Sequence, residues 1–328
     1  VIDRTIFVLG RAITAAAPAG ILIWLMANIY IGDITLLSML SGALDPIGKI
    51  MGLDGVILTA FILGFPANEI VVPIMIMAYM ENGVIVNMHL AESLLAYFIS
   101  KVLTNNEKFD IVFAVPCGLT ETEILDFKNL GLKLGAGKVT LIPSVLVALL
   151  GANINIDKAS GYLSLNLGGG TIDMAICSLN QIIKGYSLFF GGNKIDEAIK
   201  LYVNQFLDMQ ISNLTSEKIR IEAGSLFLHD LTNIEFNGVD INTKSPKTEV
   251  VGAEQLRDTL EFYFQKVYMA IKVLINSSTP DIVADLSING IIVTGGLANL
   301  TGLENYLSKN LNLPVLISEN ADNAVVLG

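Results

Sequence analysis

The chain has 328 residues, of which 52% are hydrophobic and 16% are charged, an apolar composition for a soluble protein. The formal net charge is −11 and no run of Lys or Arg occurs, so the chain lacks the basic clusters that neutralise nucleic-acid phosphates. This balance excludes a nucleic-acid partner, and the apolar content indicates that part of the chain lies in a membrane.

Two apolar stretches dominate the first eighty residues. Residues 12–32 carry no charge and are long enough to cross a hydrocarbon core of about 30 Å as a helix. Residues 55–80 contain Pro66, Pro73 and Glu69. Because proline removes a backbone donor and a carboxylate is costly at membrane depth, we expect a broken or re-entrant helix with Glu69 facing protein, water or an ion. A hydrophobic helical hairpin within a soluble core is the alternative.

Five short motifs in this region resemble the membrane gate of the FeoB ferrous iron transporters. They are FVLGRA (7–12), AAPAGILIW (16–24), LDPIG (44–48), MGLDGV (51–56) and GFPANEI (64–70). The resemblance implies a membrane segment over residues 1–80 with Glu69 near an ion path, although the GTPase domain of that family is missing. Arg4 and Arg11 precede the first stretch, so the positive-inside rule predicts a cytoplasmic N-terminus and, after two crossings, a cytoplasmic second region.

From residue 81 onward, charged residues return and helical and strand patterns alternate. The predicted helices cover residues 90–103, 121–134, 145–151, 194–207, 217–226 and 253–275, and another begins at Gly302. The predicted strands cover residues 111–115, 139–142, both sides of residues 168–170, and 314–317, with hairpins over 174–188 and around Asn237-Gly238. This alternation predicts an α/β fold with helices on both faces of a mixed sheet. Cys117 and Cys177 lack metal-ligand spacing, and we expect reduced core thiols.

Three glycine-containing turns follow predicted strands. Gly168, Gly169 and Gly170 precede Thr171 and can direct several N–H groups at one phosphate, although an ordinary hairpin turn is the simpler interpretation. A second pair of glycines at 191–192 precedes a helix that Asn193 can cap, and a third occurs at 295–296. The three turns could converge on one nucleotide.

Residues 81–328 resemble the MreB group of bacterial actin homologues. The matching motifs include ENGVI (81–85), AVPCGLTETE (114–123), GGGTID (168–173), GGNKIDEAI (191–199), EKIRIEAGS (217–225) and TGGL (294–297). The resemblance implies an actin-like ATPase fold that binds ATP or ADP with Mg²⁺. The implied nucleotide-binding residues are Asn166, Gly168, Gly169, Gly170, Thr171, Glu217, Arg220, Gly295, Gly296 and Leu297. Without the family, Glu217 and Arg220 would be a surface helical pair.

Three departures from the family pattern bear on hydrolysis. The first phosphate hairpin of the family is replaced by the apolar segment, and the actin-like region is expected to be truncated at both ends. Asn166 stands where the family has a metal-linked aspartate, and Pro143 and Ser144 stand where it has acidic residues that position water. Phosphoryl transfer depends on such groups, so we expect no catalytic residues and no turnover.

The resulting hypothesis is an incomplete actin-like fold preceded by an all-α membrane segment, with the actin-like domain on the cytoplasmic side of the cytoplasmic membrane. It predicts a cell-shape scaffold that self-associates into filaments, is attached through residues 1–80, and binds nucleotide weakly or not at all. The alternatives are a ferrous iron transporter fragment joined to an actin-like remnant, an active MreB-type ATPase, and two unrelated reading frames joined by fusion or assembly error.

Overall fold

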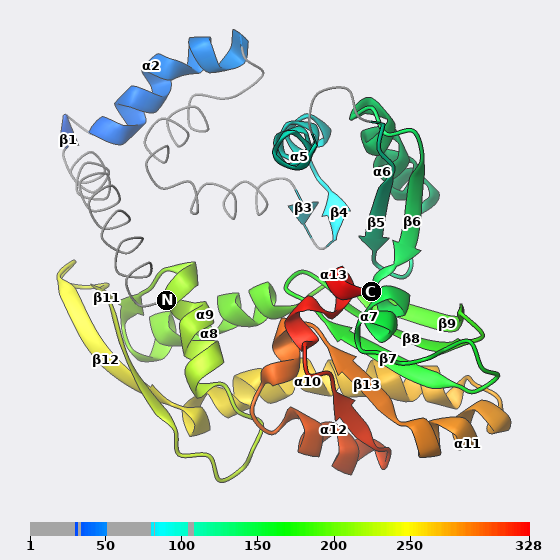
Figure 1. Ribbon diagram of the computed structural model, residues 1–328. Helices are drawn as coiled ribbons and strands as arrows, with labels where there is room; N and C mark the ends of the chain where they lie inside the picture. Colours follow the sequence, from blue (N-terminus) through cyan, green and yellow to red (C-terminus); the bar gives the residue numbers. More distant parts are fainter. Residues whose placement is uncertain (1–29, 32–33, 51–79, 82, 104–107) are drawn as a thin grey trace, which may run out of the picture. The chain divides into compact units, whose positions relative to one another are not determined.

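The computed structural model describes residues 30–31, 34–50, 80–81, 83–103 and 108–328 (Figure 1). The chain divides into two compact units. Unit 1 comprises residues 1–81 and 85–107, and unit 2 comprises residues 82–84 and 108–328. The junction predicted at residue 81 stays a prediction, since the chain passes between the units more than once.

Unit 1 has few described elements. They are β1 (Tyr30–Ile31), β2 (Ile34–Thr35), α2 (Leu36–Ile50), β3 (Met80–Glu81) and α5 (Met88–Val102), and β4 (Val84–Ile85) lies where the chain changes unit. The predicted spans over residues 12–32 and 55–80, with Glu69, lie almost wholly outside the described residues. Residues 30–31 are strand and not helix, so the first predicted span is wrong at its end. Among the described residues, no helix is long and apolar enough to cross a bilayer.

Unit 2 is built around a five-stranded mixed sheet with the order β14-β13-β7-β8-β9. Its strands are β7 (Tyr162–Leu167), β8 (Ile172–Ser178), β9 (Gln181–Leu188), β13 (Ile291–Thr294) and β14 (Val315–Ile317). β13 runs parallel to β7 and β14, whereas β7, β8 and β9 are antiparallel. The predicted mixed α/β sheet is therefore confirmed.

Strand alternation explains why both faces of this sheet are covered. On β7, Leu163, Leu165 and Leu167 are buried in the larger core. Ser164 points to the opposite face, where its Oγ donates a hydrogen bond to the carbonyl of Val145 at 2.9 Å. Because successive side chains of a strand point to opposite faces, one strand supplies both layers. The second, smaller core includes Val145, Leu149, Ala175, Cys177 and Ile292.

The helices of unit 2 cover these two faces and the smaller sheets. They are α6 (Glu121–Lys133), α7 (Ser144–Gly151), α8 (Gly192–Phe206), α9 (Asn213–Ala223), α10 (Ala253–Asn276), α11 (Pro280–Asn289), α12 (Leu303–Leu311) and α13 (Ala324–Leu327). On α10, Leu256, Leu260, Phe264 and Val267 repeat every three or four residues and are buried. The long helix therefore presents one apolar stripe to the sheet.

Two smaller sheets complete unit 2. β5 (Ile111–Val115) pairs in parallel with β6 (Val139–Pro143), and α6 packs on them through the rings of Phe113 and Phe127, 5.5 Å apart. β10 (Met209–Gln210), β11 (Asn233–Asp240) and β12 (Pro246–Gly252) form an antiparallel sheet.

The hairpin predicted around Asn237-Gly238 is wrong in position. Both residues lie within β11, and Gly238 is close to β10, because a Cβ there would lie 2.7 Å from the carbonyl oxygen of Gln210. The turn occurs at residues 241–245, where the Asp240 carboxylate accepts hydrogen bonds from the N–H groups of Asn242 and Thr243. A polar side chain, not the Asn-Gly pair, therefore sets the turn.

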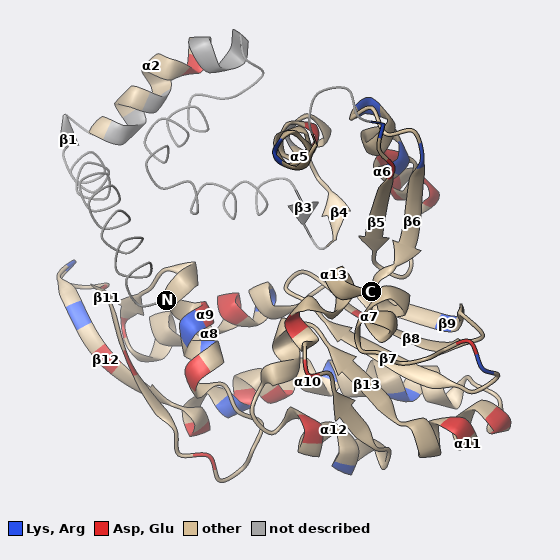
Figure 2. Cartoon of the chain, in the orientation of Figure 1, with Lys and Arg blue, Asp and Glu red and all other residues tan. Residues whose placement is uncertain are grey.

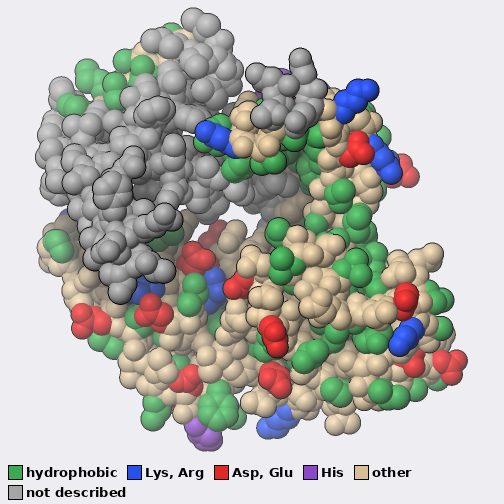
Figure 3. All heavy atoms as spheres, in the orientation of Figure 1, with side chains coloured by type: hydrophobic (Ala, Val, Ile, Leu, Met, Phe, Trp, Pro, Cys, Tyr) green, Lys and Arg blue, Asp and Glu red, His purple; other side chains and the backbone are tan. Residues whose placement is uncertain are grey.

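Charge is distributed along the surface helices. Figure 2 shows acidic residues on α8 and α11, with basic residues interspersed elsewhere. On the face of unit 2 shown in Figure 3, basic side chains are scattered among acidic and hydrophobic ones.

Candidate functional site

The triple-glycine segment is the turn between β7 and β8. The N–H of Gly168 donates to the carbonyl of Thr171 at 2.9 Å, which closes a tight hairpin. The simpler interpretation of these glycines is thus correct as geometry, but it does not remove the predicted role. No backbone hydrogen bond among the described residues uses the N–H of Gly169 or Gly170, so both groups remain available to an anion.

The second glycine turn packs directly on the first. The N–H groups of Gly192 and Asn193 donate to the carbonyls of Gly168 and Gly169 at 3.0 and 2.9 Å. A Cβ at Gly191 would lie 2.4 Å from the Gly168 oxygen, so only glycine allows this approach. The predicted cap is wrong by two residues, because Gly191 is the N-cap of α8 and no side chain caps it.

The third glycine turn follows β13, the strand next to β7, and lies beside the first turn. Gly295 has φ +88°, which favours glycine, and a Cβ there would lie 2.4 Å from the carbonyl oxygen of Leu167. Its N–H donates to the carbonyl of Ala321 at 2.7 Å. Turns more than 100 residues apart in the chain therefore converge, as the sequence predicted.

These turns border a pocket of about 340 Å³. Its lining residues are Gly168, Gly169, Gly192, Asn193, Glu217, Arg220, Ile221, Gly296, Leu297, Asn299, Leu300 and Asp322. Six of the ten predicted site residues are among them. Asn166, Gly170, Thr171 and Gly295 lie in or beside the surrounding turns without lining the pocket. Their binding role stays a prediction.

Arg220 is fixed on one side of the pocket by a buried ion pair. Its Nε lies 2.6 Å from Asp196 Oδ1, and the two side chains are 10% and 11% exposed. Glu217 is farther away, 3.6 Å from the guanidinium, and half exposed. Burial raises the pKa of Asp196, and the hydrogen bond and charge of Arg220 oppose that rise. The surface-pair alternative is therefore wrong for Arg220, whose main partner is Asp196 from α8.

Asn166 and Thr171 face inward. Asn166 is buried and its Oδ1 accepts a hydrogen bond from Thr294 Oγ1 at 3.3 Å, which ties β7 to β13. The Thr171 hydroxyl donates to Asp173 Oδ2 at 3.1 Å. Both side chains therefore stabilise the floor beneath the glycine turns.

Asp173 is a buried carboxylate that the sequence interpretation missed. Its Oδ2 also accepts from Ser144 Oγ at 3.1 Å, and its Oδ1 accepts from the N–H of Cys117 at 3.3 Å and from Ser187 Oγ. Asp173 thereby joins β8 to α7, to β9 and to the loop after β5. The GGGTID motif contained this residue, but only the fold reveals the donors around it.

The ionisable groups do not form a metal site in the described part of the chain, where no cluster of three or more His, Cys, Asp or Glu occurs. Glu217 and Asp322 are the carboxylates that line the pocket. Cys117 and Cys177 are buried free thiols, as predicted, and burial raises the pKa of each to about 12.

Comparison with known proteins identifies relatives over most of the chain. The MreB/Mbl protein family matches residues 65–328, so the match includes residues 65–80 of the segment that resembled FeoB. The cell shape-determining protein Mbl of Bacillus cereus is 31% identical over 252 residues, 76% of each chain. The cell shape-determining protein MreB of Pasteurella multocida is 29% identical, over 76% of this chain and 73% of its own.

Solved structures show the same fold. MreB5 of Spiroplasma citri, in crystals with AMPPNP and with ADP, superposes with a TM-score of 0.72 at 30% identity over 76% of each chain. The MamK double helical filament matches with a TM-score of 0.65 at 16% identity, over 76% of this chain and 78% of its own, which bears on fold alone. Unit 2 thus has the architecture of an actin-like ATPase.

Proposed function

The chain belongs to the MreB/Mbl family, and we propose that it is an actin-like cell-shape scaffold whose glycine-bordered pocket binds an adenine nucleotide without turning it over efficiently. The observation that carries this proposal is the convergence of three glycine turns with Glu217 and Arg220 around one pocket. The AMPPNP and ADP bound by the Spiroplasma citri relative support an adenine nucleotide as the ligand.

The pocket offers a distinct group for each part of a nucleotide. The N–H groups of Gly169 and Gly170 would receive phosphate oxygens, which need no side chain. The half-exposed Glu217 carboxylate can accept a hydrogen bond from a ribose hydroxyl. The Arg220 guanidinium is oriented by its ion pair with Asp196 and can stack on a base. Because Glu217 and Asp322 make the lining acidic, we expect weak binding that strengthens when a cation accompanies the phosphates.

The residues next to the turns support weak turnover. Pro143 ends β6 and Ser144 begins α7, where the Ser144 hydroxyl donates a hydrogen bond to the Asp173 carboxylate. Asp173 is buried and both of its oxygens accept hydrogen bonds, so it is poorly placed to activate a water molecule.

We also propose that the chain self-associates into filaments, that residues 1–80 attach to the cytoplasmic membrane, and that the actin-like domain lies in the cytoplasm. The apolar composition of residues 12–32 supports the membrane attachment. The FeoB resemblance has no support from the comparisons, and we do not propose iron transport.

Binding of a fluorescent ATP analogue to Gly169→Val and Gly161→Ala tests the nucleotide site. A Cβ at Gly169 meets only Asn193 Oδ1 at 3.4 Å, so the larger variant should fold while its side chain occupies the pocket. Gly161 is a matched control because its nearest neighbours lie at 3.5 Å and outside the pocket. We expect a loss of affinity of about tenfold or more for Gly169→Val alone. Saturable binding that Gly169→Val leaves unchanged would contradict the proposal.

A further inference from the structure

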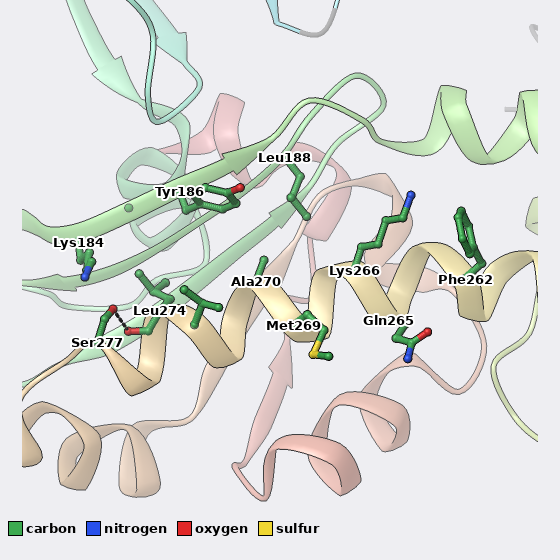
Figure 4. A pocket seen from close by; sticks show the side chains of 12 residues that line it. Lys184, Tyr186, Leu188, Phe262, Gln265, Lys266, Met269, Ala270, Leu274 and Ser277 are labelled. Atoms are coloured by element: carbon green, nitrogen blue, oxygen red, sulfur yellow. Dashed lines mark hydrogen bonds between the residues drawn. The ribbon is translucent and has the colours of Figure 1, made fainter.

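A second concavity of unit 2 lies between β9 and α10. It encloses about 580 Å³, within the range of pockets that hold small molecules. Figure 4 shows β9 crossing above α10, with Leu188 pointing from the strand toward the helix and with Ala270 and Lys266 on the side of the helix that faces the strand. The lining residues are Lys184, Gly185, Tyr186, Leu188, Phe262, Gln265, Lys266, Met269, Ala270, Val273, Leu274 and Ser277.

The lining is apolar and exposed. Tyr186, Met269 and Val273 are 51%, 53% and 69% exposed, although each is a large hydrophobic side chain. Tyr186 lies on β9, and Met269 and Val273 lie one helical turn apart on α10, so these side chains line the groove from both elements as one apolar strip. From Phe262 to Ser277 the groove follows 15 residue steps of α10, or about 22 Å at about 1.5 Å per residue.

The charge of the groove is opposite to that of the chain. The protein has a net charge of −11, yet the lining contains two lysines and no carboxylate. Neither Lys184 nor Lys266 forms an ion pair among the residues that the structure describes. Figure 4 shows Lys184 near Ser277 and Lys266 near the end marked by Phe262.

Lys266 is held in position by aromatic rings. Its Nζ lies 4.1 Å from the ring centroid of Phe262, 5.4 Å from that of Tyr263 and 5.8 Å from that of Phe190. These contacts orient the ammonium without neutralising it, so it can still bind an anion.

We propose that the β9–α10 groove binds a long-chain carboxylate, with the hydrocarbon chain along Met269, Ala270 and Val273 and the carboxylate at Lys266. An acyl chain spans about half of a hydrocarbon core of about 30 Å, which leaves room in the groove for the chain and its head. The volume of about 580 Å³ is in the range of small-molecule pockets, so a small molecule is favoured over a protein helix as the occupant.

Isothermal titration of the full chain with laurate below its critical micelle concentration tests this assignment. We expect saturable binding of laurate and none of dodecylammonium, which has the same chain and the opposite charge. Lys266→Gln should weaken laurate binding about tenfold, since it removes a charge-assisted hydrogen bond. Val273→Asp should abolish binding, because it places a carboxylate in the strip.

Lys272→Gln is the matched control. Lys272 lies on the same helix, outside the groove, with its Nζ 3.2 Å from the Tyr268 hydroxyl, so its variant should bind laurate like the unmodified protein. Far-ultraviolet circular dichroism verifies that each variant is folded. Because the Val273 side chain is exposed, its replacement by Asp should not prevent folding. Absence of laurate binding, equal binding of dodecylammonium, or unchanged binding by Lys266→Gln and Val273→Asp would overturn the assignment. Tighter, competitive binding of an acidic amphipathic helical peptide would also overturn it.

Discussion

Removal of the Arg220 guanidinium should destabilise unit 2 strongly at neutral pH. In Arg220→Met the Asp196 carboxylate stays buried, with an 11% exposed side chain, but loses its partner at 2.6 Å. Breaking a buried ion pair from one side costs about 3–5 kcal/mol. In urea, where small proteins lose about 1–3 kcal/mol of stability per molar, the midpoint should fall by about 1 M or more.

The pH dependence follows from the pKa of Asp196. Burial already raises this pKa above its usual value, and loss of Arg220 removes the groups that oppose the rise. A carboxyl group whose pKa is higher in the folded state binds its proton more tightly there, so folding is penalised at pH values above the folded pKa. The penalty decreases as the pH falls through the folded pKa towards the unfolded one, so the destabilisation should be smaller at about pH 5 than at about pH 7.5.

Urea unfolding followed by circular dichroism at both pH values measures these effects. Lys218→Met is the control on the same helix, because Lys218 lies 3.9 Å from Glu222 and both side chains are more than half exposed. Such a surface pair contributes about 0–1 kcal/mol. The double variant Asp196→Leu, Arg220→Met should regain much of the loss. Equal effects of Arg220→Met and Lys218→Met, or an effect independent of pH, would refute the reasoning.

Two further predictions concern groups beneath the pocket. In Asp173→Ala the hydroxyls of Ser144 and Thr171 and the N–H of Cys117 lose their acceptor, whereas the Ser187 hydroxyl can still donate to the carbonyl of Cys117, so we expect a loss of about 3 kcal/mol or more in urea unfolding. Asp281→Ala on the exposed start of α11 should change the stability little, and similar values for both variants would contradict this role. Burial raises the pKa values of Cys117 and Cys177 to about 12, so few of these thiols are ionised at about pH 8. They should react with Ellman's reagent at least about 100-fold more slowly in the native protein than in urea. Fast labelling of the native protein would show that the thiols are accessible.

Local sequence patterns were sufficient for most elements of unit 2. The predicted strand over residues 111–115 coincides with β5, and the predicted helix over 253–275 differs from α10 by one residue. Capping explains the accuracy at α6, where the Thr120 side chain accepts from the N–H of Glu123 and the Glu123 carboxylate accepts from Thr120. Where side chain and backbone satisfy one another locally, the boundary can be predicted from sequence.

Longer-range features could not be predicted in this way. α11 was missed, and its tertiary hydrogen bonds include one from the N–H of Gly161 to Asp285, 124 residues away. The ion pair between Arg220 and Asp196 could not be predicted either, since Glu217 is the sequence neighbour of Arg220 but Asp196 approaches from another helix. The glycine turns that border the pocket could be recognised from sequence, whereas Asp173 and Asp196 derive their importance from neighbours that only the fold supplies.

The hydrogen bond between Gly295 and Ala321 has a consequence for the order in which the molecule is completed. The β7–β8 turn is synthesised about 150 residues before Ala321, so the nascent chain carries this turn before the partner of Gly295 exists. Closing so long a loop is entropically slow compared with forming the hairpin itself. The pocket can therefore be completed only after residue 321 has been synthesised, which makes it a late feature of folding.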